Sequence, residues 1–312
     1  MTEDTAERGG GWIGIGELSR RTGVPVRTIR FYCDEGVLSC ERTTGGHRMF
    51  EQAAVEQLTL LRQLRAVGLG LPTAAGVLSG GVRVADAIAA ERAALDDELA
   101  ALAWRRSALR AIEDDPGQPL RRLELLAAVQ DRKAAEDRLL EFWRRLLGPL
   151  PASMFDAFAV MNIPTLPADP APRQLLTFAE LVRHLTYPTA KAAMSQSIWR
   201  SKPADIKDRR GLLVGLAEAG EQVADLVSTG VDPHPGPILD HFVAAHAAAR
   251  GSTDTAAFRT TLLHAATETD PWTHRYWTLT GDLVGPATTG AAQLWLHRAL
   301  AHSVQAARTV RN

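Results

Sequence analysis

The chain has 312 residues, of which 46% are hydrophobic, enough to bury a core in each of two domains. Its 35 basic residues nearly balance 36 acidic ones, so any affinity for nucleic acid must come from a local basic patch. An apolar signal region and long uncharged apolar runs are both missing, which argues against export and against a membrane partner. We therefore expect a cytoplasmic protein, and the two cysteines, Cys33 and Cys40, suit a reducing compartment.

The first ordered segment is predicted to contain two short helices joined by a glycine turn. Residues 1–11 are polar and expected to be disordered, and IGIGELSRRTG then favours a helix that ends at Gly23. Pro25 suits the first turn of a second helix, in which Val26, Ile29 and Cys33 form one inward stripe. This helix, from Pro25 to Asp34, completes a helix-turn-helix pattern and ends before Gly36.

A small hairpin is expected to follow the second helix. Residues 38–50 lose the helical period, and the part from 41 to 50 carries Gly45 and Gly46 at its centre, which is typical of a turn that needs positive φ. The hairpin would form a wing beside the helix pair. Helical patterns from Glu51 and from Pro72 to Leu78 then complete a predicted winged domain over residues 12–81.

The winged domain also holds the local basic patch. Arg27 and Arg30 lie opposite the apolar stripe of the second helix, in the half of a recognition helix that reaches base edges in the major groove. Ser19 and Thr28 are suited to bonding phosphates. The segment from Arg20 to Arg48 contains six arginines and three acidic residues, an excess of three positive charges. The arginines are Arg20, Arg21, Arg27, Arg30, Arg42 and Arg48, and the acidic residues are Asp34, Glu35 and Glu41. We therefore expect this domain to bind double-stranded DNA.

A long helix is predicted from Val82 to Glu113, where Pro and Gly are absent. It would be about 48 Å long. Apolar residues recur along it in steps of seven, and the candidate dimerisation residues are Ile88, Leu95, Leu99, Leu102, Leu109 and Ile112. A coiled-coil repeat has two apolar positions in every seven residues, and Arg92 and Arg106 occupy the second of these. A single amphipathic helix that packs on a globular core is therefore the alternative. We assign residues 82–115 to this dimerisation helix.

Residues 116–312 carry helical patterns and no alternating strand pattern, which predicts an all-α C-terminal domain. The fold class is therefore mainly α. Helices are expected at 120–147, 172–185, 189–199, 208–227, 237–250, 255–267, 271–280 and 289–304. Six prolines between Pro149 and Pro172 favour a long irregular connection, which either packs over a pocket or crosses the surface.

Aromatic residues are the candidate ligand-binding groups of the C-terminal domain. Asp270 and Pro271 favour a helix start that places Trp272 and Tyr276 one turn apart. Aromatic walls suit an apolar, planar or cationic small molecule, and the alternative is that these side chains fill a helical core. The candidates are Trp143, Trp199, Trp272, Tyr276 and Trp277.

Catalytic, metal and cofactor sites are not expected. Both cysteines precede the long helix, and His241 and His246, like His297 and His302, are five positions apart, so the members of each pair do not stack as helical ligands would. A nucleophile elbow, a phosphate-binding loop, a dinucleotide fingerprint and a zinc-protease motif are all missing from residues 116–312. An enzyme fused to a DNA-binding module therefore ranks last among the hypotheses.

The first third of the chain resembles the MerR family of bacterial transcription regulators. The resemblance covers residues 12–113 and rests on IGELSRRTGVPVRTIRFYCDEGVL, on the wing ERTTGGHRMF and on the long helix. It implies that Arg27 contacts bases, while Thr28, Arg30, Tyr32 and Arg48 lie nearer the DNA backbone. The full set of candidate DNA-binding residues is Ser19, Arg20, Arg27, Thr28, Arg30, Tyr32, Arg42, Gly46, His47 and Arg48. Departures from the family pattern occur at Phe31 and His47, where Tyr is frequent.

The same resemblance implies a homodimer held by an antiparallel coiled coil and bound to a pseudo-palindromic promoter. Such regulators bend and untwist promoter DNA when an effector binds, and so act on RNA polymerase indirectly. Residues 116–312 would then bind a small apolar or aromatic effector. The alternative is a constitutive or architectural DNA-binding protein whose C-terminal domain serves oligomerisation or partner docking.

Overall fold

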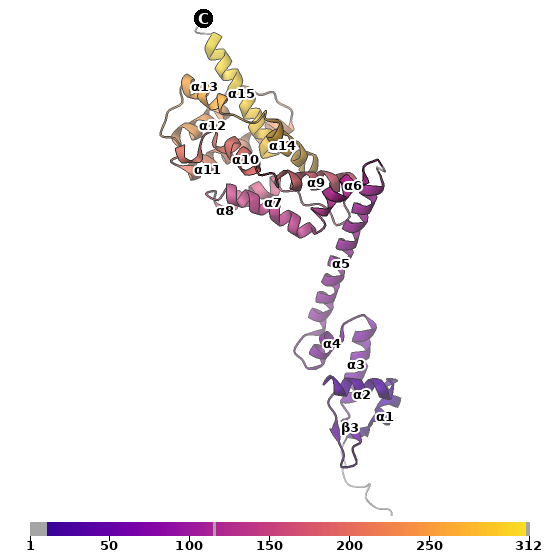
Figure 1. Ribbon diagram of the computed structural model, residues 1–312. Helices are drawn as coiled ribbons and strands as arrows, with labels where there is room; N and C mark the ends of the chain where they lie inside the picture. Colours follow the sequence, from indigo (N-terminus) through magenta and orange to yellow (C-terminus); the bar gives the residue numbers. More distant parts are fainter. Residues whose placement is uncertain (1–10, 115–116, 310–312) are drawn as a thin grey trace, which may run out of the picture. The chain divides into compact units, whose positions relative to one another are not determined.

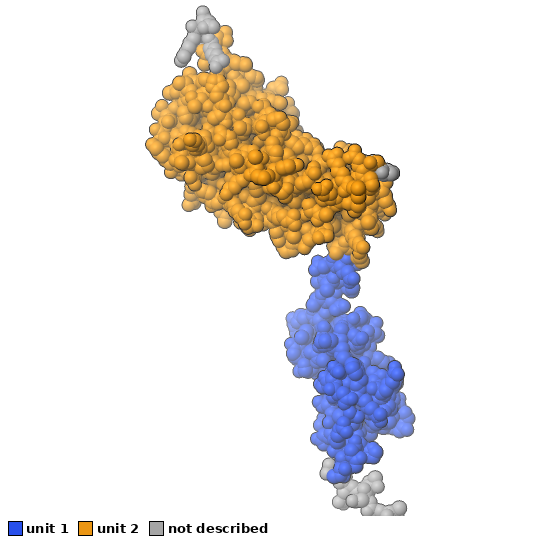
Figure 2. All heavy atoms as spheres, viewed as in Figure 1, with its two compact units in different colours: residues 1–99 blue, residues 100–312 orange. Residues whose placement is uncertain are grey.

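The computed structural model describes residues 11–114 and 117–309. The chain divides into two compact units, residues 1–99 and 100–312, which are coloured separately in Figure 2. Its fold is mainly helical, as the sequence predicts. Among the described residues, no helix combines the length and the apolar character needed to cross a membrane.

The N-terminal unit is a helix-turn-helix with a small antiparallel sheet (Figure 1). Its elements are β1 (Trp12–Gly14), α1 (Ile15–Thr22), α2 (Val26–Asp34), β2 (Glu41–Arg42), β3 (Arg48–Glu51), α3 (Ala54–Ala66) and α4 (Leu71–Leu78). Gly23 ends α1 with φ of 70°, in the left-handed region that suits glycine. The hairpin expected at 41–50 is present as β2 and β3. The strand β1 was not expected, and the sheet order is β1-β3-β2.

Two clusters of buried side chains hold this unit together. The first joins the sheet to α1, α2 and the start of α3, and includes Leu18, Ile29 and Phe50, all fully buried. The second joins α3 to α4 through Leu61 and Leu69. Because Ile29 fixes one face of α2 inside the first cluster, the opposite face of α2 remains at the surface.

The long helix is α5 (Val84–Glu113), which has 30 residues and is therefore about 45 Å long. Its first part belongs to the N-terminal unit, and the residues from Ala100 belong to the C-terminal unit. Trp104, Ser107 and Ala111 are buried in the C-terminal unit, where the Trp104 indole donates to the carbonyl of Val129 at 2.9 Å. The end of the helix is thus part of the C-terminal core.

The C-terminal unit is all-α (Figure 1). Its helices are α6 (Pro119–Ala127), α7 (Arg132–Leu146), α8 (Ala152–Asn162), α9 (Pro172–His184), α10 (Ala190–Trp199), α11 (Arg209–Ser228), α12 (Pro237–Ala248), α13 (Ala256–His264), α14 (Pro271–Val284) and α15 (Thr289–Thr309), with a short 3-10 turn at Pro203–Asp205. Two differences from expectation stand out. The pattern at 120–147 divides at Asp131, whose side chain caps α7, and the proline-rich connection contains the helix α8.

Two hydrophobic cores lie within this unit. The first is built mainly from α6, α7, α9, α10 and α14, together with the end of α5. The second is built from the end of α11 with α12, α13 and α15. Leu216 of α11 packs against both cores, so α11 connects them.

Candidate functional site

The outer face of α2 presents two arginines. Arg27 and Arg30 are exposed, whereas Ile29 between them is fully buried. The turn before α2 is fixed by Arg62, which donates to the carbonyl of Thr22 at 3.0 Å, and by the hydroxyl of Ser19, which donates to the carbonyl of Val24 at 2.7 Å. The guanidiniums of α2 are therefore carried on a rigidly packed helix.

The wing is connected to α2 by an ion pair. Arg48 of β3 donates to Asp34 at the end of α2 at 2.6 Å, and its side chain is 16% exposed. At the wing tip, the backbone amide of Gly46 donates to the carbonyl of Thr43, and His47 is exposed. The recognition helix and the wing thus form one surface with a fixed mutual orientation.

The predicted DNA-binding residues divide into two groups by exposure. Six are exposed: Arg20, Arg27, Arg30, Arg42, Gly46 and His47. Four are partly buried: Ser19, Thr28, Tyr32 and Arg48. Among these four, Tyr32 packs against both hydrophobic clusters of the N-terminal unit, while Ser19 and Arg48 make the intramolecular bonds described above.

The apolar seam of α5, which we define as Ile88, Leu95, Leu99, Leu102 and Leu109, is exposed along its whole length. Each side chain exposes between 46% and 63% of its surface. Ile112, the sixth candidate dimerisation residue, is partly buried against the first core of the C-terminal unit. A row of exposed leucines on a helix is an unusual feature of a monomeric surface and is typical of an interaction site.

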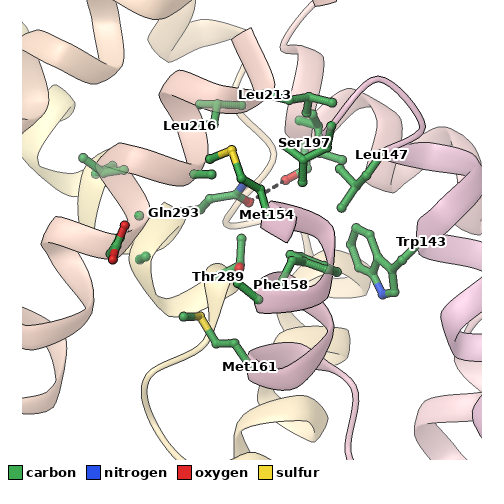
Figure 3. Close-up of a pocket in the computed structure, with 18 of the residues that line it drawn as sticks. Trp143, Leu147, Met154, Phe158, Met161, Ser197, Leu213, Leu216, Thr289 and Gln293 are labelled. Atoms are coloured by element: carbon green, nitrogen blue, oxygen red, sulfur yellow. Dashed lines mark hydrogen bonds between the residues drawn. The ribbon is translucent and has the colours of Figure 1, made fainter. Parts of the chain in front are cut away.

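A cavity of about 310 Å³ lies in the C-terminal unit where its two cores meet (Figure 3). Trp143, Met194 and Leu213 line it from the first core, and Phe242 and Leu296 line it from the second. Figure 3 shows α8 along one side, with Met154, Phe158 and Met161 at intervals of four and three residues. All three methionines of the C-terminal unit, Met154, Met161 and Met194, line this cavity, and flexible thioether side chains adapt to varied ligand shapes.

Few polar groups reach the cavity. Ser197 donates to the side-chain oxygen of Gln293 at 3.4 Å, and Asn162 donates to the hydroxyl of Thr289 at 2.9 Å. Glu221 lines the cavity from an exposed position on α11. Within the described residues, the indole nitrogen of Trp277 is buried without a hydrogen-bond partner. A mainly apolar cavity with a few polar groups is the usual form of a small-molecule site.

The five candidate ligand-binding aromatics occupy different places. Trp143 and Trp277 line the cavity, and their ring centroids are 5.5 Å apart. Tyr276 is fully buried behind Trp143 and accepts the indole hydrogen at 2.7 Å, and this burial raises the pKa of the Tyr276 hydroxyl. Trp272 stacks on His184 with centroids 4.2 Å apart, and Trp199 is buried at the end of α10.

Three of the five candidates, Trp199, Trp272 and Tyr276, therefore do not line the cavity. Other lining residues, among them Met154, Phe158, Met161 and Gln293, were not identified from the sequence. The spacing of Met154, Phe158 and Met161 is a helical signal that the surrounding prolines obscured.

A close approach of two helices fixes the cavity wall at Trp277. A Cβ atom added to Gly290 of α15 would lie 2.0 Å from Cγ of Trp277, far inside van der Waals contact. Glycine is therefore required at this position for the indole to lie where it does. Among the described residues, we find no group of three or more histidine, cysteine or acidic side chains placed to hold a metal ion.

The N-terminal unit has the architecture of a winged helix-turn-helix DNA-binding domain: a packed recognition helix with outward arginines, and a basic wing fixed beside it. Residues 14–81 match the family model described as MerR HTH family regulatory protein. This part of the chain is therefore a MerR-type helix-turn-helix domain.

Several curated proteins are similar to the chain. Nodulation protein NolA of Bradyrhizobium sp. (strain NC92) is 30% identical over 125 residues, which are 40% of this chain and 53% of that protein. The HTH-type transcriptional regulator HmrR of Rhizobium leguminosarum bv. viciae is 37% identical over 59 residues, 19% of this chain and 46% of HmrR. CueR of Salmonella typhi is 37% identical over 60 residues, 19% of this chain and 44% of CueR.

The chain thus spans about half the length of the curated relatives it matches. No solved structure matches it significantly.

Proposed function

We propose that the chain is a cytoplasmic, MerR-type transcription regulator that binds promoter DNA as a homodimer and responds to a small molecule in the C-terminal cavity. The observation that carries the DNA-binding part is the outward pair Arg27 and Arg30 on a helix fixed beside a basic wing. The names of HmrR and CueR, both HTH-type transcriptional regulators, support the regulatory part.

The exposed seam of α5 supports the homodimer. An apolar residue every seventh position gives a strip that a second copy of the same helix covers in an antiparallel coiled coil. Two winged domains related by a two-fold axis then bind two half-sites about one DNA turn, roughly 34 Å, apart. Deformation of the promoter between the half-sites would act on RNA polymerase indirectly.

The cavity supports the effector part. Its volume of about 310 Å³, its aromatic and methionine walls and its few polar groups suit a small apolar or aromatic molecule. Because α5 contributes Trp104 and Ala111 to the core of the same unit, the helix that carries the seam is anchored in the domain that holds the cavity. A ligand that repacks this core can therefore bias the seam and the DNA-binding domains.

Two measurements test the proposal on the full chain. Duplexes selected by the protein from a randomised pool should converge on two inverted half-sites; a single half-site bound by a monomer would contradict the dimeric mode. In a thermal-shift screen against apolar and aromatic compounds, at least one chemical class should raise Tm by more than about 1 °C. DNA binding without any shift across the panel would favour an architectural protein.

A further inference from the structure

A group of ionisable side chains lies next to the cavity, and we define it as the ion cluster: Arg200, His246, Arg250, Glu268 and His297. Two helices supply neighbouring residues to the cavity and to the cluster: Phe242 and His246 on α12, and Gln293 and His297 on α15. Residues four apart lie one helical turn apart on the same face, so these histidines are next to the cavity wall. Arg200, the residue that follows α10, joins them through its side chain, whose Cζ lies 5.0 Å from the ring centroid of Phe242.

The cluster holds more positive than negative charge. Arg200 and Glu268 form an ion pair, and their side chains are only 1% and 3% exposed. Arg250 donates to the imidazole Nδ1 of His246 at 3.1 Å and to the hydroxyl of Ser201 at 3.3 Å. The cluster thus holds two guanidiniums and one carboxylate, and the other charges that act here, Asp205 on Arg250 and Arg298 on His297, lie at exposed positions.

Burial keeps His246, the fully buried histidine of this cluster, neutral. His246 is fully buried, and this desolvation lowers the pKa of its imidazole well below the usual value, with the charges of Arg200 and Arg250 acting in the same direction. Because Arg250 donates to Nδ1, the proton of the neutral ring is on Nε2. His246 therefore has a hydrogen-bond donor at Nε2.

Several polar atoms of the cluster lack a hydrogen-bond partner within the described part of the chain: Arg200 Nη1, His246 Nε2, Glu268 Oε2 and His297 Nδ1, of which the last two lie 3.9 Å from each other. Buried polar groups are normally paired, since each unpaired one costs free energy. Arg200 also has φ of 47°, and it is the one non-glycine residue with positive φ among those described. Such backbone conformations persist where the surroundings fix them and are concentrated at functional sites.

Phe242 contacts the cavity and the side chains of Arg200 and His246. Its ring centroid is 5.0 Å from Cζ of Arg200 and 4.8 Å from the imidazole centroid of His246, and the same residue lines the cavity. Phe242 is therefore a neighbour that the cavity shares with these two polar side chains.

We propose that the effector is an organic acid, whose apolar body fills the cavity and whose carboxylate displaces the Phe242 ring to accept hydrogen bonds from Arg200 and His246. A carboxylate supplies one negative charge, which balances the excess positive charge of the cluster, and its two oxygens match two donors. This inference rests on the proposed effector function and adds the chemical class of the ligand to it.

Matched pairs of acid and neutral amide test the inference by calorimetric titration of the full chain. The probes are 1-naphthaleneacetate, indole-3-acetate and dodecanoate, each against its own primary amide. For the pairs that bind, the acid should bind about tenfold more tightly than the amide, since hydrogen bonds to a charged group contribute more. The variant H246L should remove about this tenfold preference for the acid, whereas H241L, which changes an exposed histidine of the same helix, should leave the preference unchanged.

A second pair of variants separates the inference from the proposed function. F242A, which removes the ring that must move, should raise acid affinity, while A157W, which fills the cavity from α8, should abolish binding of acid and amide alike. Equal affinity for acid and amide would overturn the organic-acid inference and leave the effector function standing. If no acid and no amide binds, or if A157W binds them all, both the inference and the cavity function are overturned.

Discussion

At the scale of single residues, Arg27 shows how packing makes a side chain available for recognition. Its neighbour Ile29 is fully buried in the cluster that joins α1, α2 and the sheet, so Arg27 is held on the opposite face of a short helix. A planar guanidinium with five donors matches the acceptor edge of guanine in the major groove. Arg27 is exposed, and none of the described acidic residues constrains it by an ion pair of the kind that holds Arg48.

We expect R27A to weaken binding to the selected duplex by about 1–3 kcal/mol and to relax the sequence preference at one base pair. The reason is the loss of direct base contacts, while helix packing is untouched. Fluorescence anisotropy with labelled duplexes measures the affinity. R210A, which removes an exposed arginine from the C-terminal unit, serves as the control for total charge. Equal affinities of R27A and the parent protein would show that α2 does not read the bases.

Gly290 is the second residue whose role depends on a single atom. We expect G290A to destabilise the C-terminal unit by about 1–3 kcal/mol, because its Cβ would lie 2.0 Å from Cγ of Trp277. Chemical denaturation followed by tryptophan fluorescence measures this loss. G220A is the control, since Gly220 is a helical glycine that lines the cavity and a Cβ added to it would meet none of the described residues within 4 Å. Equal stability of the two variants would mean that the indole moves aside freely.

At the scale of elements, most helix starts can be predicted because they carry local signals. Asp131, Asp208 and Asp270 each accept a hydrogen bond from the backbone at a helix start, and prolines begin α9, α12 and α14. The sequence pattern places helix starts at Asp208 and Asp270, whereas the cap at Asp131 falls inside the single helix predicted at 120–147 and divides it into α6 and α7. The helix α8 was missed because prolines on both sides of it were interpreted as a sign of irregular structure.

The cavity could not be predicted from the sequence in the same way. Its walls come from α7, α8, α10, α11, α12, α14 and α15, and only the packing of these helices brings Trp143 near Gln293. Two of the predicted aromatics, Trp143 and Trp277, line the cavity. Tyr276 instead accepts a hydrogen bond from Trp143, and Trp272 stacks on Tyr276. The recognition helix and the wing can be predicted from the sequence, because each is formed by residues that are close together in the chain.

The seam of α5 makes a prediction at the element scale. We expect L95E to shift the protein from dimer to monomer, because a charged side chain would be buried without a partner in the middle of the helix pair. Sedimentation velocity measures the change. A90E is the control, since Ala90 is exposed and lies about 200° around the helix from Ile88. A parent protein that is already monomeric, or an L95E variant that remains dimeric, would show that the seam is not the dimer interface.

At the scale of the whole molecule, α5 belongs to both compact units and is therefore the covalent route between the DNA-binding domain and the cavity domain. Its last three turns are part of the C-terminal unit through the buried side chains of Trp104, Ser107 and Ala111. The hydroxyl of Ser107 donates to the carbonyl of Pro170 at 2.6 Å, which connects the helix to the segment before α9. A change in the packing of this core can therefore alter the position of the helix that carries the seam.

Thermodynamic linkage gives the corresponding prediction. An effector that binds the cavity should change the affinity for the selected duplex by about 5–150-fold, and the duplex should change the affinity for the effector by the same factor. Anisotropy titrations with and without saturating effector, and calorimetry with and without DNA, measure the two factors. The cavity-filled variant A157W should show neither change. Effector binding with unchanged DNA affinity would mean that the two sites are uncoupled.

The contact between Gly290 and Trp277 also has an evolutionary consequence. A larger residue at the position of Gly290 is compatible only with a smaller residue at the position of Trp277, so the two positions should covary among proteins that share this C-terminal domain. Chains that combine glycine and tryptophan at these positions should have the same cavity wall. Chains that exchange the pair should have a cavity of different shape and, with it, a different range of ligands. Two positions 13 residues apart in the sequence would then identify the ligand class of a regulator before its structure is known.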